Sequence, residues 1–181
     1  MLNANKIQDL MKILEKTREY AIRKHKEANH KYDEYDYDFH LNMVYEIAKK
    51  FIYLIEPSEQ ENVLAGCWVH DIIEDARETY NDVKKETNET IAELAYALTN
   101  EKGRNRAERA NEKYYKGIRE TKNASFIKFC DRIANVTHSK NNRSRMFDKY
   151  KDENDNFIAK IYVPNCQEIS EHLKDLFKEK H

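Results

Sequence analysis

The chain has 181 residues, the size of one ordinary domain, so it can bury a core without disulfides. Lys and Arg number 32 and Asp and Glu 33, which excludes a strong whole-molecule attraction to nucleic acid or to an anionic membrane. The polar N-terminus and the absence of about 18 consecutive apolar residues argue against a signal peptide and a membrane span. The odd set Cys67, Cys130 and Cys166 indicates free thiols. We therefore expect a soluble, cytoplasmic protein.

Only three glycines and two prolines occur, and apolar residues recur at three- and four-residue spacing, which predicts an all-α domain. Pro57-Ser58-Glu59 and Thr87 with Thr90 are candidate helix starts. The polar segment 141–157 fits either a solvated helix or a long surface loop. The predicted helices cover 5–29, 40–55, 59–74, 79–84, 87–99, 105–119, 124–138 and 166–179.

The stretch "AGCWVHDIIEDA", residues 65–76, places ionisable side chains inside an apolar helical pattern. On a continuous helix, His70 and Glu74 would share one face, with Asp71 and Asp75 beside them. Burying unpaired carboxylates costs several kcal/mol, so the cluster requires a partner charge such as a divalent cation. The alternative is one histidine bonded to a backbone carbonyl, followed by an exposed acidic helix end.

Two other segments favour the cation. "FIKFCDRIAN", residues 126–135, surrounds Asp131 with apolar residues and places Asn135 one turn further on. His40 begins an amphipathic pattern over 37–51. Two imidazoles and two carboxylates suit manganese, iron or zinc, and the lack of thiolates argues against a structural zinc site.

The order H…HD…D resembles the HD superfamily of metal-dependent phosphohydrolases. The chain is also similar to the hydrolase domain of the RelA/SpoT alarmone family and its stand-alone small hydrolases. The matches are "AIRKH" at 21–25, Tyr37-x-x-His40, "AGCWVHDIIED", "ALTNEK" and "IKFCDRIAN". This resemblance implies a single all-α HD-type hydrolase domain over 1–181 with a buried metal site. Its core would cover about 10–140, followed by a helical extension over 141–181.

By this resemblance, the protein would remove the 3′-diphosphate from guanosine 3′,5′-bis(diphosphate) or its pentaphosphate, giving GDP or GTP and pyrophosphate. One Mn²⁺ ion, with Fe²⁺ or Zn²⁺ as alternatives, would be held by His40, His70, Asp71 and Asp131. Glu74 and Asp75 would handle the protons of the attacking water. The alternative for these two acids is the solvated end of a helix.

The resemblance also implies nucleotide-binding residues. Arg23 and Lys24 match an Arg-Lys pair near the guanine base, although they equally fit the polar face of a surface helix. Asn135 matches a nucleotide-contacting asparagine. Tyr37 matches the tyrosine before the first metal histidine, and buried packing explains it equally well. The expected partner is thus a small-molecule nucleotide, without nucleic acid or membrane, and the sequence does not determine an oligomeric state.

Lys102, with Arg104 and Arg106, is a candidate phosphate-facing residue, although ordinary loop charges look the same. The remaining histidines have no evident partner, and we expect them to be surface or incidental residues. They are His25, His30, His138, His172 and His181.

Three features depart from the alarmone family pattern. Thr137 stands where a basic residue is usual, Leu41 where proline is usual, and an acidic, aromatic segment over 29–38 replaces a glycine-bearing loop. They keep two alternatives open: an HD phosphatase or phosphodiesterase acting on another nucleotide, and a non-catalytic nucleotide sensor.

Overall fold

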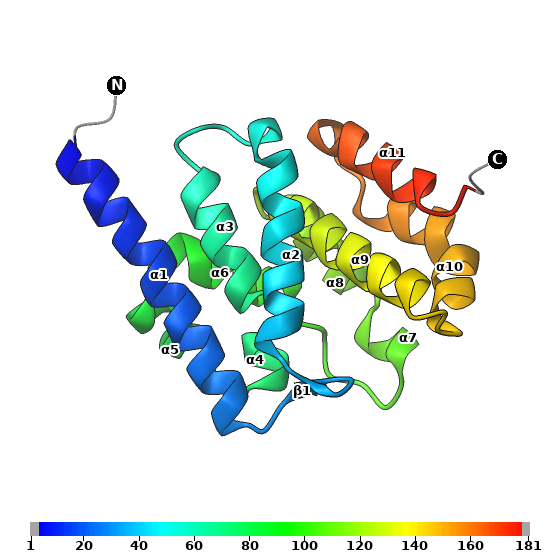
Figure 1. The fold of residues 1–181 in the computed structure, drawn as a ribbon, viewed down its shortest axis with the longest axis horizontal. Coiled ribbons are helices and arrows are strands. Elements are labelled where there is room, and N and C mark those ends of the chain that lie inside the picture. The colour runs from blue at the N-terminus through cyan, green and yellow to red at the C-terminus, as the bar shows by residue number, and fades with distance from the viewer. Residues whose placement is uncertain (1–3, 179–181) are drawn as a thin grey trace.

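The structure is a computed structural model that describes residues 4–178, with the side chains of 4–12, 106 and 107 left aside. It confirms the all-α prediction (Figure 1). One short antiparallel hairpin, β1 and β2, joins the first two helices and pairs Tyr32 with Tyr35. The helices are α1 (Ala4–Glu27), α2 (Asp38–Phe51), α3 (Gln60–Val69), α4 (Ile72–Asp75), α5 (Tyr80–Glu86), α6 (Glu89–Leu98), α7 (Arg106–Arg109), α8 (Glu112–Glu120), α9 (Ala124–Asn141), α10 (Met146–Ile161) and α11 (Gln167–Asp175), and the strands are β1 (Lys31–Tyr32) and β2 (Tyr35–Asp36).

Helices α2 and α3 lie side by side in the middle of the molecule (Figure 1). Helix α1 packs along α3, α9 packs along α2, and α10 and α11 pack on α9. Helix α3 contributes buried residues to two hydrophobic clusters, Cys67 to one and Trp68 to the other. The end of α3 therefore reaches the region between the two halves of the core.

Gly66 marks a close approach within this packing. A Cβ atom there would lie 2.8 Å from Cδ1 of Ile127 in α9 and 3.1 Å from Cδ1 of Leu94 in α6. The missing side chain thus lets α3 lie tightly against both helices.

The predicted helix over 59–74 is wrong in one respect, because it breaks at His70 and Asp71. Helix α3 ends at Val69, Asp71 has φ −127° and ψ 8°, and α4 begins at Ile72. Neighbouring residues on one continuous helix do not face the same way. The break allows the side chains of both His70 and Asp71 to lie in the interior.

Two helix starts also differ from the prediction. Asn88, rather than Thr87 with Thr90, begins α6, and its side chain accepts a hydrogen bond from the backbone N–H of Ile91 at 2.9 Å. The predicted 105–119 helix divides before α8, where the side chain of Asn111 caps the new helix. A local side-chain acceptor therefore sets each boundary.

The segment 141–157 proves to be largely helical, and it is not fully solvated. Helix α10 buries Phe157, Ile158 and Ile161 in the same cluster as Phe126 and Phe129 of α9. The predicted C-terminal extension therefore completes the main core.

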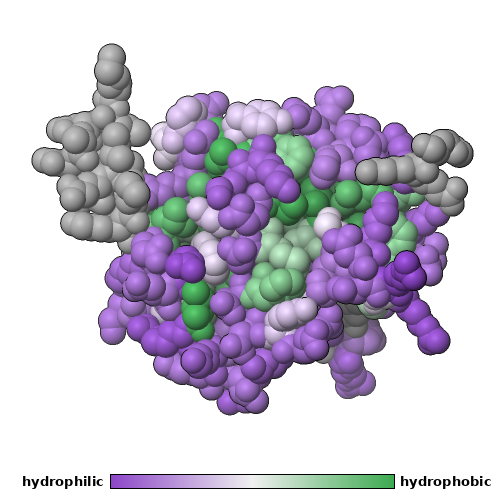
Figure 2. Space-filling model, viewed as in Figure 1, coloured by the Kyte–Doolittle hydropathy of each residue, from purple (hydrophilic) through white to green (hydrophobic). Residues whose placement is uncertain are grey.

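The surface in Figure 2 is mostly hydrophilic, with hydrophobic residues gathered toward the middle of that face. The three cysteines are buried and unpaired, as expected for thiols that pack as small apolar groups. No helix in the described part of the chain has the length and apolar character needed to cross a membrane.

Candidate metal centre

Three of the four predicted metal ligands converge in one buried group. His40 comes from the first turn of α2, His70 from the end of α3, and Asp131 from the middle of α9. One ligand atom from each lies within 4.8 Å of the others. Nε2 of His40 lies 3.3 Å from Oδ1 of Asp131, and Nε2 of His70 lies 3.9 Å from the same oxygen. Segments far apart in the sequence therefore present two imidazoles and a carboxylate to one point.

The hydrogen bond at the far side of His70 fixes which of its nitrogens can bind a cation. Nδ1 of His70 lies 2.9 Å from the backbone carbonyl of Cys67. A carbonyl only accepts, so Nδ1 carries a proton, and Nε2 is the nitrogen that can present a lone pair to a cation. That lone pair faces Oδ1 of Asp131 and Oδ2 of Asp71, the latter at 3.2 Å. Electron pairs that converge in this way require a proton or a metal ion between them, and the donor set suits a divalent transition metal.

Asp131 is held as a carboxylate by its surroundings. Burial alone would raise its pKa, but the ammonium of Lys128, 2.9 Å from Oδ2, and the contact with His40 hold the pKa well below its usual range. Asn135 donates from Nδ2 to Oδ1 at 2.6 Å. Burial disfavours the charge of Lys128 too, yet Asp131 raises the pKa of this lysine. Asp131 therefore keeps its negative charge and its orientation.

Asp71, the fourth predicted ligand, lies beside this group and outside the set of three. Its Oδ2 accepts a hydrogen bond from the hydroxyl of Tyr37, and its Oδ1 lies 3.4 Å from Nε2 of His25. Burial opposes its charge, but His70, His25 and His40 hold its pKa well below the usual range. Asp71 is thus an anchored carboxylate adjoining His70.

The expectation that His25 is a surface or incidental residue is wrong, because its side chain is 1% exposed. It lies one turn after the buried Ala21 on the inner face of α1, a spacing that could have revealed it. His30 is half-buried, and its Nδ1 lies 3.0 Å from Nδ1 of His25. His138 also has a partner, since its Nε2 lies 2.8 Å from Oδ2 of Asp33. His25 and His30 also stack with the ring of Tyr37, so the two histidines pack around Tyr37 and Asp71.

The predicted proton-handling residues lie in α4 with exposed side chains. Both carboxylate oxygens of Glu74 accept hydrogen bonds from Nδ2 of Asn100 at 2.9 Å. The pKa of Asp75 is raised to about 6, first by partial loss of hydration and then by the negative charges of Asp71 and Glu74. A carboxyl group with a raised pKa can supply a proton near neutral pH.

A cavity of about 140 Å³ adjoins Asp131 and carries two cationic side chains that the sequence analysis did not assign. Lys128 lies three residues before Asp131, a helical spacing that signals their pairing. The guanidinium of Arg132 lies 4.1 Å from the ring centroid of Phe157. The lining also includes Asn100, Tyr115, Asn135 and Tyr150.

Of the five predicted nucleotide-binding residues, two contact the buried carboxylates. They are Tyr37, which contacts Asp71, and Asn135, which contacts Asp131. Tyr37 is buried against Asp71, which agrees with its alternative explanation as a packed aromatic residue. Arg23 and Lys24 project from α1 and pair with Glu27, and within the described range no contact joins them to the metal group.

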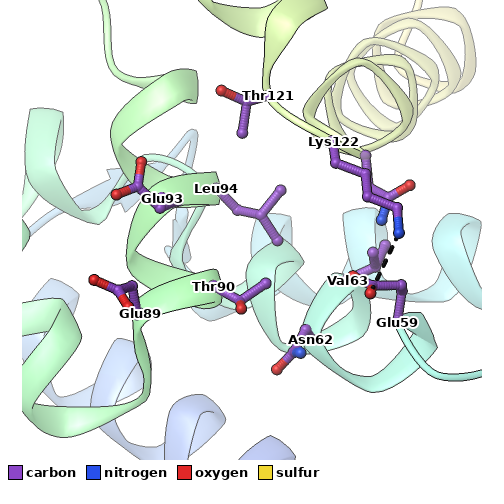
Figure 3. Close-up of a pocket in the computed structure, with 10 residues that line it drawn as sticks. Glu59, Asn62, Val63, Glu89, Thr90, Glu93, Leu94, Thr121 and Lys122 are labelled. Atoms are coloured by element: carbon purple, nitrogen blue, oxygen red, sulfur yellow. Dashed lines mark ion pairs between the residues drawn. The ribbon is translucent and has the colours of Figure 1, made fainter.

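Lys102 is exposed beside a hollow of about 730 Å³ between α6 and α8. This hollow shares Asn100 and Tyr114 with the cavity at Asp131, so Lys102 borders a neighbouring space. A separate cavity of about 430 Å³ lies between α3, α6 and the start of α9 (Figure 3). An ion pair of Lys122 with Glu59 at 3.3 Å crosses its rim, and none of the predicted site residues lines it.

In comparisons with protein-family models and with curated proteins, the sequence matches none of them. The resemblance to HD phosphohydrolases therefore remains a prediction from the residue pattern. Any function has to be inferred from that pattern and from the geometry of the buried group.

Proposed function

We propose that the protein is a metal-dependent phosphohydrolase that removes the 3′-diphosphate from guanosine 3′,5′-bis(diphosphate), releasing pyrophosphate. The observation that carries this proposal is the buried group of His40, His70 and Asp131 with its converging lone pairs. The order of these residues along the chain also resembles that of HD phosphohydrolases.

The donor set fits a divalent ion such as Mn²⁺, with His40, His70 and Asp131 as the residues that would hold it and Asp71 adjoining. Such an ion supplies a lowered pKa for water and offsets negative charge on phosphate. Without a bound ion, the charge of Lys128 keeps Asp131 anionic, so a carboxylate is present before a cation binds.

Glu74 and Asp75 would divide the proton transfers. Glu74 is kept as an acceptor by the amide of Asn100 and would take the proton of the attacking water. Asp75, with a pKa of about 6, is partly protonated near neutral pH and would supply a proton to the departing oxygen.

The diphosphate is expected to occupy the cavity beside Asp131. A volume of about 140 Å³ is too small for a whole nucleotide, so the cavity would take only the phosphate end of the substrate. Lys128, which is paired with Asp131, and Arg132, which is paired with Glu153 at 3.4 Å, supply positive charge, and Asn135 supplies an amide, all on consecutive turns of α9. The nucleoside would extend out of this cavity.

A second function is an HD phosphatase or phosphodiesterase that acts on another nucleotide. It is favoured by Thr137. It is also favoured by the ion pair of Lys24 with Glu78 at 3.2 Å, which engages one residue of the expected guanine clamp.

The test is a Mn²⁺-supplemented assay of the purified chain on guanosine tetraphosphate, with anion-exchange separation of products. We expect GDP and pyrophosphate, lost in Asp131→Ala and retained in Asp155→Ala, which removes an exposed carboxylate of α10. Orthophosphate or turnover of another nucleotide would support the second function. If the protein hydrolyses neither guanosine tetraphosphate nor any of a panel of mono-, di- and cyclic nucleotides, both proposed enzyme functions are contradicted. A non-catalytic nucleotide sensor would then be favoured.

A further inference from the structure

Tyr32 lies in strand β1 of the hairpin and contacts the buried group of His40, His70 and Asp131 through the ring of His40. Its ring stacks on that of His40, with centroids 4.7 Å apart and planes inclined by 13°. Its hydroxyl donates a hydrogen bond to Oδ1 of Asn135 at 2.8 Å. One side chain thus touches a predicted ligand directly and reaches a second through an amide.

Asp131 and Tyr32 together orient the Asn135 amide, because the oxygens of Asp131 can only accept and leave Oδ1 of Asn135 to accept from the hydroxyl of Tyr32. With Oδ1 accepting from Tyr32, Nδ2 faces Asp131, where it donates to Oδ1 at 2.6 Å and to the backbone carbonyl at 3.0 Å. Oδ1 of Asp131 is the same oxygen that lies near Nε2 of His40 and of His70. A continuous chain of hydrogen bonds therefore runs from the hairpin to the metal-facing oxygen.

The stacking contact has a separate role, because the two histidines are oriented differently. Nδ1 of His70 is fixed by the carbonyl of Cys67. Nδ1 of His40 is buried and has no hydrogen-bond partner among the residues the structure describes. The ring of His40 therefore lacks the usual second hydrogen bond that orients a metal-binding imidazole. Tyr32 covers the face of this ring instead.

We propose that Tyr32 is a positioning residue of the metal centre, which fixes Oδ1 of Asp131 through Asn135 and the ring plane of His40 through stacking. The inference depends on the metal site of the proposed function. It adds that the hairpin is part of the binding apparatus, although none of its residues is a predicted ligand.

Tyr35 offers a matched control on the same hairpin. It pairs with Tyr32 across the two strands, but its side chain is 42% exposed and stacks on Phe39 with centroids 4.3 Å apart. A substitution of Tyr35 changes the same hairpin at a position that makes no contact with His40 or Asn135 among the described residues, so it is expected to leave those contacts intact.

The experiment measures Mn²⁺ affinity of the full chain from the electron paramagnetic resonance signal of free Mn²⁺. Tyr32→Phe should weaken binding about 10-fold, the lower end for loss of an outer-shell hydrogen bond. Tyr32→Leu should weaken it further, because the stack on His40 is lost as well. Tyr35→Phe and Tyr35→Leu should bind like the wild type. In an Asn135→Ala background, Tyr32→Phe should cause no additional loss, because the hydroxyl acts through Asn135.

Different results overturn different parts of the reasoning. If the wild type binds Mn²⁺ and Asp131→Ala does not, yet Tyr32→Phe binds normally, the positioning role is wrong while the metal centre stands. Equal weakening by Tyr32→Phe and Tyr35→Phe would also reject it, because a general effect on the hairpin would then suffice. A wild-type chain that binds none of Mn²⁺, Fe²⁺ and Zn²⁺ would reject the proposed function together with this inference.

Discussion

Replacing Lys128 by methionine should destabilise the metal-free protein by leaving Asp131 without its cation. Nζ of Lys128 lies 2.9 Å from Oδ2 of Asp131, and the two side chains are only 22% and 12% exposed. Removing one partner of a buried ion pair costs roughly 3–5 kcal/mol. We expect about 3 kcal/mol, the lower end of that range, because Lys128 retains some exposure and Asn135 still donates to the carboxylate.

For a chain of this length, about 3 kcal/mol corresponds to a fall of roughly 6–12 °C in the melting midpoint. Circular dichroism at 222 nm, recorded with excess chelator, measures it directly. Lys113→Met is the matched control, because Lys113 also lies 2.9 Å from its partner Glu101 but is 79% exposed. This control should melt with the wild type, since exposed pairs contribute little.

Added Mn²⁺ should then raise the midpoint of Lys128→Met more than that of the wild type. The variant site carries one more uncompensated negative charge, so a divalent cation binds it more tightly and stabilises the fold accordingly. Equal melting of Lys128→Met and Lys113→Met without metal would refute the buried pair. An equal Mn²⁺ effect on variant and wild type would refute the claim that the ion binds beside Asp131.

Glu74→Gln should bind Mn²⁺ normally but lose at least about 100-fold in turnover, because the proton acceptor is removed; normal turnover would take Glu74 out of the reaction. Burial raises the pKa of Glu61, whose carboxylate oxygens have no partner within the described residues. The contribution of Glu61 to stability is present below about pH 4.3, the pKa of a glutamate in the unfolded chain. This contribution is lost as the pH rises through the higher pKa that Glu61 has in the folded chain. Glu61→Gln should therefore melt above the wild type at pH 7 and approach it near pH 4, and a constant difference would contradict this. His25→Leu should lower stability by about 1–3 kcal/mol, because a buried polar partner of Asp71 and His30 is lost; unchanged urea unfolding would show that Asp71 does not need it.

The sequence predicts the helices well because each has an apolar face with helical spacing that tertiary packing reinforces. Asp131 is the clearest case. Its neighbours Phe129, Cys130 and Ile133 are all fully buried, as their pattern requires, and the carboxylate is buried with them. An ionisable group in such a pattern needs a partner or a proton, so its presence makes the position a candidate site.

What the sequence does not predict are contacts made between distant segments. At the break, Asp71 contacts His25, Tyr37 and His70, and helical periodicity contains no information about these contacts. The stacking of Tyr32 on His40 likewise depends on where a two-residue strand places its ring. Short strands have weak patterns of their own, so their positions emerge only with the packed helices.

Gly66 bears on the spacing of two members of the buried group. It lies one turn before His70, and its close neighbour Ile127 lies one turn before Asp131 on α9. A methyl group at Gly66 would have to displace the tip of Ile127, because it would lie 2.8 Å from Cδ1 of that side chain. In the proposed metal site, this close approach of α3 and α9 would help to set the distance between His70 and Asp131, and with it the radius of the cation that fits between them.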